Sequence, residues 1–158
     1  MDPACLVVDL PDEAATAGLA ARLARRAEAG DVIGLQGELG MGKTTFARAF
    51  IRALGNGTEE VPSPTFTLAE IYAFAGRPPI WHFDLYRLEE PREAYELGIE
   101  DAFAEGISLI EWPERLGALL PAEHLLLALG EGSSPDGRRA RLSVTARWAE
   151  RLSEIAHG

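Results

Sequence analysis

The sequence predicts an α/β fold, in which a mostly parallel central sheet lies between two layers of helices. Two observations support this prediction. Expected strands and helices alternate along most of the chain, and one glycine-rich loop joins an expected strand directly to an expected helix. The 158 residues, 47% of them hydrophobic and 25% charged, are typical of one globular unit. We therefore expect residues 1–158 to form a single domain.

The N-terminal third is expected to contain a helix, a strand and a second helix. The segment Pro-Asp-Glu at 11–13 suits a helix start, because proline is tolerated in the first turn and acidic residues favour the positive end of the helix dipole. An alanine-rich helix is expected over 14–29. Residues 31–36 have the apolar pattern of a short buried strand, and 44–54 carry apolar residues at helical spacing before a terminal glycine.

The rest of the chain continues the alternation. The expected strands are 66–72, 80–85, 107–111, 124–129 and 139–145, and the expected helices are 91–104, 113–120 and 148–156. The first two of these strands flank a Gly-Arg-Pro-Pro turn, so we expect an antiparallel hairpin there.

Charge and composition exclude several classes of protein. The net charge is −10, and a nucleic-acid-binding surface needs clustered bases, so the chain is poorly suited to binding nucleic acid unaided. No run of apolar residues is long enough for a membrane helix, and the first residues lack the pattern of a secretory signal. Cys5, the single cysteine, has no partner for an internal disulfide. These features favour a cytoplasmic protein.

The strongest motif fits G-x-x-x-x-G-K-[ST] and lies between an expected strand and an expected helix, which is the context it requires. Its residues are Gly37, Glu38, Leu39, Gly40, Met41, Gly42, Lys43 and Thr44. The glycines let successive backbone N–H groups turn toward phosphate oxygens, and the helix start adds its positive end. The lysine ammonium suits the outer phosphates and the threonine hydroxyl suits Mg²⁺. The motif therefore predicts a phosphate-binding loop in a domain with a P-loop NTPase-like fold.

The alternative interpretation of this loop is a glycine-rich turn with a solvated lysine. Lys43 is the only lysine in the chain, where all other basic residues are arginine. Arginine is a poor substitute for a compact ammonium in a phosphate cradle, so this lone lysine favours phosphate binding.

Two carboxylates are candidates for the acidic group that helps to hold Mg²⁺ in such sites. Glu111 ends an apolar strand pattern, and Asp84 lies near the end of another, where it shares a face with His82. The alternatives are an exposed strand-end acid for Glu111 and a turn-capping carboxylate for Asp84. For His82 the alternative is a structural histidine. Thr65, in a proline-stiffened segment downstream of the loop, is a candidate sensor of the outermost phosphate, or else part of an extended entry to the next strand.

Four motifs in order resemble the TsaE family of small bacterial P-loop ATPases, which are needed to make threonylcarbamoyladenosine in tRNA. They are GELGMGKTTFARAF at 37–50, SPTFTL at 63–68, HFDLYRL at 82–88 and LIEWPER at 109–115. The resemblance runs from about residue 11 to 129.

The resemblance implies a role for each matching residue. It implies that residues 37–45, including Thr45, bind ATP, and that Thr44 and Glu111 hold Mg²⁺. It implies that Lys43 and Asp84 take part in hydrolysis and that Thr65 is switch-like. The resemblance further implies that Trp112, Glu13, Thr16 and Arg138 lie around the nucleotide.

The resemblance also implies slow ATP hydrolysis that resets a TsaD–TsaB complex between rounds of tRNA modification. Two alternatives remain open at this point. One is a small-molecule kinase, for which the arginine-containing segment 130–141 would be a lid; the other is a switch that responds to nucleotide occupancy without turnover. For the charge-stabilising arginine of hydrolysis, Arg87 is a candidate, as is a partner's residue.

A last expectation concerns the acidic segment after Asp84. If 91–104 is one helix, Glu93, Glu96 and Glu100 lie on one face. That face is either solvated or docks on a basic partner surface.

Overall fold

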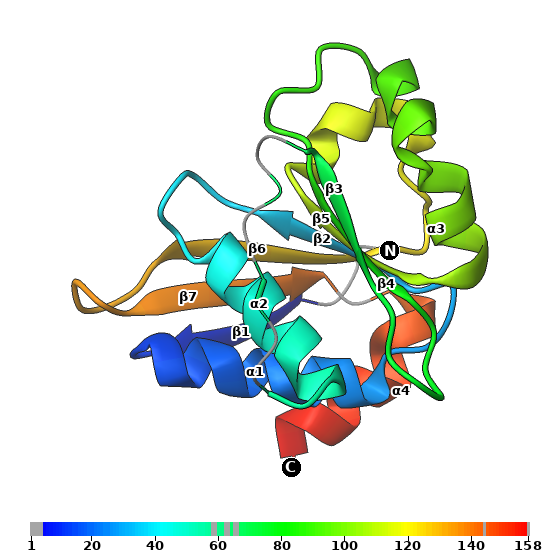
Figure 1. The fold of residues 1–158 in the computed structure, drawn as a ribbon. Coiled ribbons are helices and arrows are strands. Elements are labelled where there is room, and N and C mark those ends of the chain that lie inside the picture. Colours follow the sequence, from blue (N-terminus) through cyan, green and yellow to red (C-terminus); the bar gives the residue numbers. More distant parts are fainter. Residues whose placement is uncertain (1–4, 58–59, 62–63, 65–66, 144, 158) are drawn as a thin grey trace.

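The computed structural model describes residues 5–57, 60–61, 64, 67–143 and 145–157. Its centre is one seven-stranded sheet in the order β1-β7-β6-β2-β5-β4-β3 (Figure 1). The strands are β1 (Cys5–Leu10), β2 (Val32–Gln36), β3 (Ala69–Tyr72), β4 (Ile80–Asp84), β5 (Ile107–Glu111), β6 (Leu125–Glu131) and β7 (Arg138–Ser143).

The middle of the sheet is parallel and its edges are antiparallel. Strands β6, β2, β5 and β4 pair in parallel. Strand β3 pairs antiparallel with β4, as the expected hairpin requires, and β7 pairs antiparallel with both β6 and β1. The parallel strands bring their carboxyl ends to one edge, which is where ligands bind in open α/β sheets.

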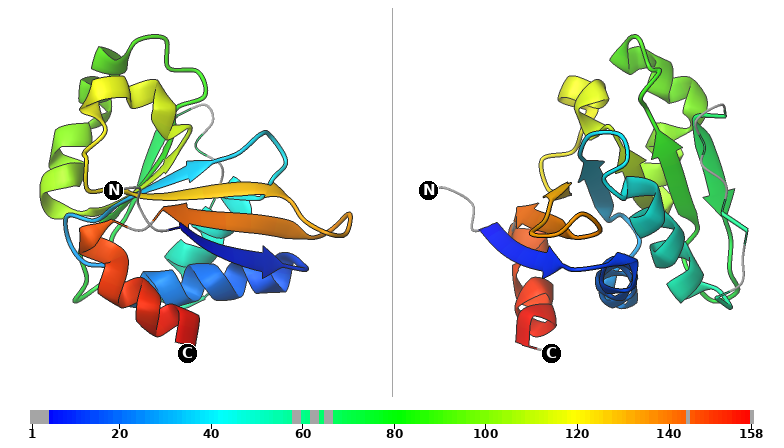
Figure 2. Two further views of the ribbon diagram at one scale, coloured as in Figure 1. Left: turned by 180° about the vertical axis from the view of Figure 1, so that it is seen from behind. Right: turned by 90° about the vertical axis from the view of Figure 1, so that its left-hand side faces the viewer.

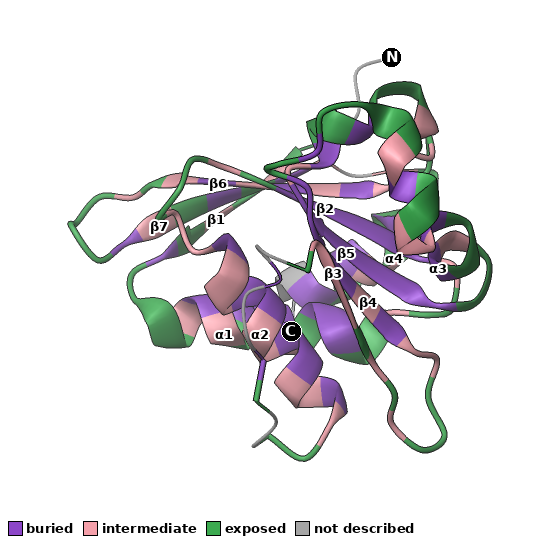
Figure 3. Cartoon of the chain, turned by 45° about the horizontal axis from the view of Figure 1, so that its top comes forward, coloured by how far each residue is buried: buried purple, intermediate pink, exposed green. Residues whose placement is uncertain are grey.

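Helices cover the sheet in two layers. The helices α1 (Glu13–Arg26), α2 (Lys43–Leu54) and α4 (Ala146–His157) share one hydrophobic core with one face of the sheet. The short helices η1 (Pro91–Leu97) and η2 (Pro113–Leu119) and the helix α3 (Ile99–Glu105) share a second core on the other face, beside β4 and β5. Two further views show this division, and burial is concentrated on the central strands and the inward helix faces (Figures 2 and 3). The predicted α/β fold is confirmed.

The two long N-terminal helices begin differently. Asp12 caps α1 by accepting a hydrogen bond from the N–H of Ala15 at 2.8 Å. The N-cap of α2 is Gly42, at φ +99°, which has no side chain that could cap the helix. Its first N–H groups are therefore available to a ligand.

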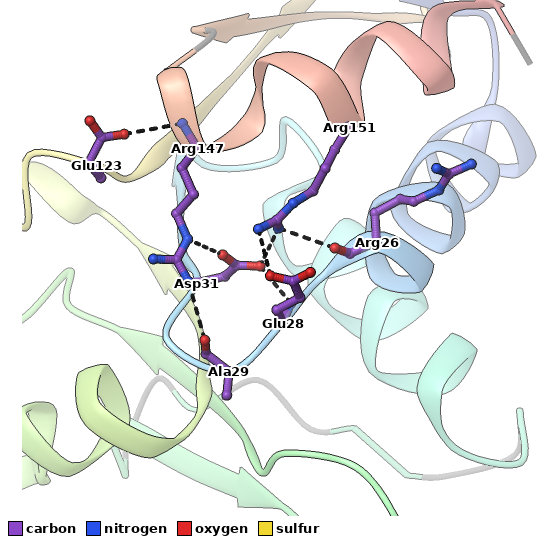
Figure 4. Close-up of polar contacts among 7 residues, drawn as sticks. All are labelled: Arg26, Glu28, Ala29, Asp31, Glu123, Arg147 and Arg151. Atoms are coloured by element: carbon purple, nitrogen blue, oxygen red, sulfur yellow. Dashed lines mark hydrogen bonds and ion pairs between the residues drawn. The ribbon is translucent and has the colours of Figure 1, made fainter.

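The helix α4 is fastened to the sheet by a buried ion cluster around Asp31, which directly precedes β2 (Figure 4). One carboxylate oxygen accepts from Arg147 Nε at 2.6 Å and the other from Arg151 Nη1 at 2.6 Å. The second oxygen also accepts from the backbone N–H of Glu28 at 2.6 Å. This cluster joins the last helix to the amino end of the parallel strands.

Several expected elements need correction. The single acidic helix over 91–104 is wrong, because Gly98, at φ +84°, ends η1 and precedes α3. Glu93 and Glu96 therefore lie on a 3₁₀-helix and Glu100 on another helix, so the expected common face does not exist. The helix expected over 113–120 is the 3₁₀-helix η2 (Pro113–Leu119), which is broken at Gly117.

The N-terminal boundaries differ as well. The first helix ends at Arg26 rather than at residue 29. The strand β1 was not expected from the sequence. It pairs along its whole length with β7, from Cys5 opposite Ser143 to Leu10 opposite Arg138. Its sequence, CLVVDL, is apolar except for Asp9 and so is compatible with a strand, but its place in the sheet depends on pairing with a strand from the far end of the chain.

Candidate functional site

A cavity of about 330 Å³ opens at the carboxyl edge of the parallel strands. It lies between the start of α1, the glycine-rich loop, the ends of β4 and β5, and the β6–β7 hairpin. Its lining residues are Glu13, Thr16, Leu39, Gly40, Gly42, Lys43, Thr44, Thr45, Asp84, Glu111, Trp112, Asp136 and Arg138.

The loop between β2 and α2 requires glycine at its first position. A Cβ atom on Gly37 would lie 2.6 Å from the carbonyl oxygen of Leu129, so a side chain there would separate the loop from the end of β6. Gly40 and Gly42 have φ of +85° and +99°, which L side chains rarely adopt. The loop is thus packed against the sheet and presents the uncapped start of α2 to the cavity.

Lys43 is buried at the base of this loop, with 5% of its surface exposed. Its ammonium donates hydrogen bonds to the carbonyl oxygens of Gly37 and of Glu38, the latter at 3.1 Å. Burial lowers the pKa of Lys43, although the nearby carboxylates of Glu111 and Asp84 oppose this shift. Burial removes water from the ammonium, and a hydrogen bond to a phosphate oxygen would compensate for that loss.

Asp84 and Glu111 lie side by side at the ends of neighbouring parallel strands, as register partners on β4 and β5. Both are buried, with 6% and 3% of their surfaces exposed, so the exposed strand-end alternative for Glu111 is wrong. The Thr44 hydroxyl donates to the Glu111 carboxylate, with distances of 3.1 and 3.3 Å to its oxygens. Asp84 lines the cavity, and its Oδ1 accepts from the N–H of Tyr86 at 3.1 Å, as the turn-capping alternative requires.

The imidazole of His82 contacts the carboxylate of Glu111. Its Nε2 lies 2.7 Å from Glu111 Oε2, and its side chain is fully buried. Because a carboxylate accepts hydrogen bonds, Nε2 is the protonated nitrogen of this contact. Among the described residues, the other ring nitrogen, Nδ1, has no hydrogen-bond partner. His82 is thus in direct contact with the carboxylate of Glu111, a contact that the sequence did not indicate.

Trp112 forms one wall of the cavity. Its backbone has φ +62°, unusual for a residue other than glycine, and its ring lies 4.2 Å from Lys43 Nζ. Tyr86 packs on the same indole, with ring centroids 5.0 Å apart. Sequence reasoning missed Tyr86, although its place two residues after Asp84 in the HFDLYRL motif was a usable signal.

The structure brings most of the predicted residues together. Glu13 and Thr16 reach the cavity from α1, and Arg138 reaches it from the start of β7. Gly37, Glu38 and Met41 shape the loop but do not line the cavity. Thr65 lies outside the described residues. Asp136, in the hairpin, lines the cavity and was not predicted, because nothing in its local sequence marks it.

The lining carries four acidic side chains against two basic ones. A polyphosphate would be repelled by this excess of acid unless a divalent cation accompanied it. Among the described residues, no group of three His, Cys, Asp or Glu side chains could hold a metal alone. The hydroxyl of Thr44 and the carboxylate of Glu111 are oxygen donors of the kind that Mg²⁺ takes together with phosphate oxygens and water.

Comparison with known proteins identifies the family. A family model described as "Threonylcarbamoyl adenosine biosynthesis protein TsaE" matches residues 10–140, which is most of the chain. The chain belongs to the TsaE family. It is 37% identical to a TsaE protein of Bacillus subtilis over 145 residues, which cover 91% of this chain and 87% of that relative.

Other matches agree on the family. The chain is 42% identical to a TsaE protein of Rickettsia conorii over 111 residues, 70% of this chain but only 63% of that relative. The crystal structure of Bacillus subtilis YdiB matches with a TM-score of 0.81 and 28% identity, covering 99% of this chain and 97% of that one. The TsaE family takes part in the biosynthesis of threonylcarbamoyladenosine in tRNA.

Two further observations bear on the predictions. No helix in the described part of the chain is long and apolar enough to cross a membrane. The segment that the kinase alternative treated as a lid is the β6–β7 hairpin, whose strands pair from Leu126 opposite Ser143 to Glu131 opposite Arg138.

Proposed function

We propose that this TsaE-family chain binds ATP together with Mg²⁺ and hydrolyses it slowly. We further propose that its ATPase cycle resets a cytoplasmic TsaD–TsaB-like complex that modifies tRNA. One observation carries the nucleotide part of this proposal: the buried ammonium of Lys43, the hydroxyl of Thr44 and the carboxylate of Glu111 meet beneath a glycine-rich loop at an uncapped helix start.

Each residue would have a separate part in the reaction. The loop N–H groups and Lys43 bind the phosphates and balance the charge that develops on them. Thr44 and Glu111 hold Mg²⁺, which when bound supplies further positive charge to the phosphates. Asp84, beside Glu111 and at the cavity wall, orients the water that attacks the γ-phosphorus; the bond to the bridging oxygen breaks, and ADP and phosphate leave.

The partner part of the proposal rests on the family and on the pathway's chemistry. The net charge of the chain is −10 and the cavity is lined by four acidic side chains against two basic ones, which is unsuited to direct tRNA binding. We therefore assign the transfer of the threonylcarbamoyl group to the partner complex and the nucleotide cycle to this chain.

Reconstituted tRNA modification tests the proposal. Repeated turnover by a TsaD–TsaB complex should require this protein and ATP, and a non-hydrolysable ATP analogue should not replace ATP. Full activity with the analogue would instead establish an occupancy switch. Transfer of phosphate from ATP to a metabolite rather than to water would establish the kinase.

A further inference from the structure

Arg138 is the second basic residue of the cavity, and its guanidinium lies on the phosphate loop. Its Nη2 donates to the carbonyl oxygen of Gly40 at 3.2 Å, although the two residues are 98 positions apart in the chain. Its Nη1 donates to the carbonyl oxygens of Pro135 at 3.1 Å and of Gly137 at 2.7 Å. All of these acceptors are neutral, and an oxygen that gains negative charge during hydrolysis is a stronger acceptor for a guanidinium than any of them.

The hairpin that carries Arg138 is fixed relative to the loop. The N–H of Gly132 donates to the carbonyl of Gly137 at 3.1 Å, and that of Gly137 donates to Ser134 at 3.0 Å. Below the turn, the backbone of Leu129 lies against Gly37 so closely that no Cβ fits between them. The arginine is therefore held at the phosphate loop before any nucleotide arrives, which reduces the cost of ordering it.

Neighbouring arginines do not share this position. Arg87, the candidate that the sequence suggested, is exposed and does not line the cavity. Arg139, next to Arg138 on β7, is exposed on the opposite face of the sheet, where its Nε pairs with Asp9 at 3.1 Å.

We propose that Arg138 is the catalytic arginine of this site, supplied by the chain itself rather than by a partner. This inference rests on the proposed ATPase function. When water attacks the γ-phosphorus and the bond to the bridging oxygen breaks, negative charge grows on the leaving oxygen of ADP. Arg138 leaves the Gly40 carbonyl and donates hydrogen bonds to that charge; it stays protonated throughout, so the reaction consumes only ATP and water.

The test compares Arg138→Ala and Arg138→Lys with Arg139→Ala as the matched control, in the full chain, alone and with a TsaD–TsaB complex. Single-turnover hydrolysis should fall about 100-fold in Arg138→Ala and remain low in Arg138→Lys. ATP affinity, measured by calorimetry, should change less than about threefold. Binding of ADP with aluminium fluoride, which imitates the transition state, should be lost, and added guanidinium should restore part of the rate.

The outcomes distinguish failure of the role of Arg138 from failure of the proposed ATPase function. If Lys43→Ala abolishes hydrolysis while Arg138→Ala hydrolyses like the parent, the ATPase stands and the role of Arg138 is refuted. Equal losses of ATP affinity and aluminium fluoride binding would make Arg138 a ground-state contact and would also refute it. If the parent neither binds nor hydrolyses ATP, the proposed function fails and this inference fails with it.

Discussion

The two ends of the parallel sheet each bury a carboxylate, on neighbouring strands. Asp31 precedes β2 at the amino end, and Glu111 ends β5 at the carboxyl end. Asp31 is fully buried, and its two oxygens receive hydrogen bonds from two guanidinium groups and one backbone N–H, each at 2.6 Å. Both carboxylate oxygens of Asp31 therefore already accept hydrogen bonds from within the protein.

Glu111 is almost as deeply buried, but the groups that contact it differ. They include the hydroxyl of Thr44 and the imidazole of His82. The charge of Lys43 interacts with Glu111, but its ammonium donates hydrogen bonds to carbonyl oxygens of its own loop. Asp31 is thus hydrogen-bonded directly to two guanidinium groups, whereas Glu111 is hydrogen-bonded to a hydroxyl and an imidazole. We infer that the first buried carboxylate stabilises the fold and that the second serves a ligand.

Asp31→Ala should have the largest effect, which we expect on the free energy of unfolding and not on nucleotide affinity. It leaves Arg147 and Arg151 without their shared carboxylate and should lower the free energy of unfolding by about 3 kcal/mol. Urea unfolding measures this loss. Asp9→Ala, which breaks the exposed pair with Arg139, is the control and should cost less than about 1 kcal/mol. The nucleotide affinity of folded Asp31→Ala should equal that of the parent. A large loss of affinity would contradict the assignment of a purely structural role to Asp31.

Lys43→Ala should show the opposite pattern. ATP affinity should fall about 100-fold, equivalent to about 2.7 kcal/mol, because the ammonium that neutralises the outer phosphates is gone. The free energy of unfolding should stay level or rise slightly, since burial lowers the pKa of Lys43 and so disfavours its charged form in the folded protein. Calorimetric titration and urea unfolding of the same sample check both statements. Unchanged ATP affinity in a folded variant would refute the phosphate-loop assignment.

Substitutions of the two carboxylates at the site should affect different steps, Mg²⁺-dependent ATP binding for Glu111 and hydrolysis for Asp84. Glu111→Gln should raise the Mg²⁺ concentration needed for ATP binding by on the order of 10–100-fold, because it removes a metal contact. Asp84→Asn should leave ATP affinity within about threefold and slow hydrolysis about 100-fold, because it disturbs the attacking water. Titrating ATP at several Mg²⁺ concentrations decides between them. Two variants that weaken ATP binding equally, with no effect on turnover, would contradict these roles.

His82→Gln should give the smallest effect. Glutamine keeps an N–H donor but not the rigid placement of the imidazole, so the Mg²⁺ requirement should rise about threefold, and His82→Leu should raise it about tenfold. ATP affinity in EDTA serves as the comparison within each variant and should not move. A merely structural histidine would instead lower the free energy of unfolding in both variants and leave the Mg²⁺ requirement unchanged.

The sequence by itself determined the local chemistry of the site. Residues 37–44 form the cradle because glycine torsions and a helix start are properties of neighbouring residues, and both act over a few positions. The strand-end positions of Asp84 and Glu111 followed from apolar runs that end in an acid. The same local logic found the α/β alternation and the β3–β4 hairpin.

Tertiary structure alone decided which distant groups meet. The pairing of β1 with β7, the contact of His82 with Glu111 and the approach of Arg138 to Gly40 depend on the order of strands in the sheet, which no local pattern encodes. The break at Gly98 is different, because a glycine that ends a helix at positive φ is a local signal, and the regular spacing of the acidic residues outweighed it in the prediction. Local patterns fix backbone torsions and exposed faces, whereas contacts between segments far apart in the chain are selected by packing of the whole domain.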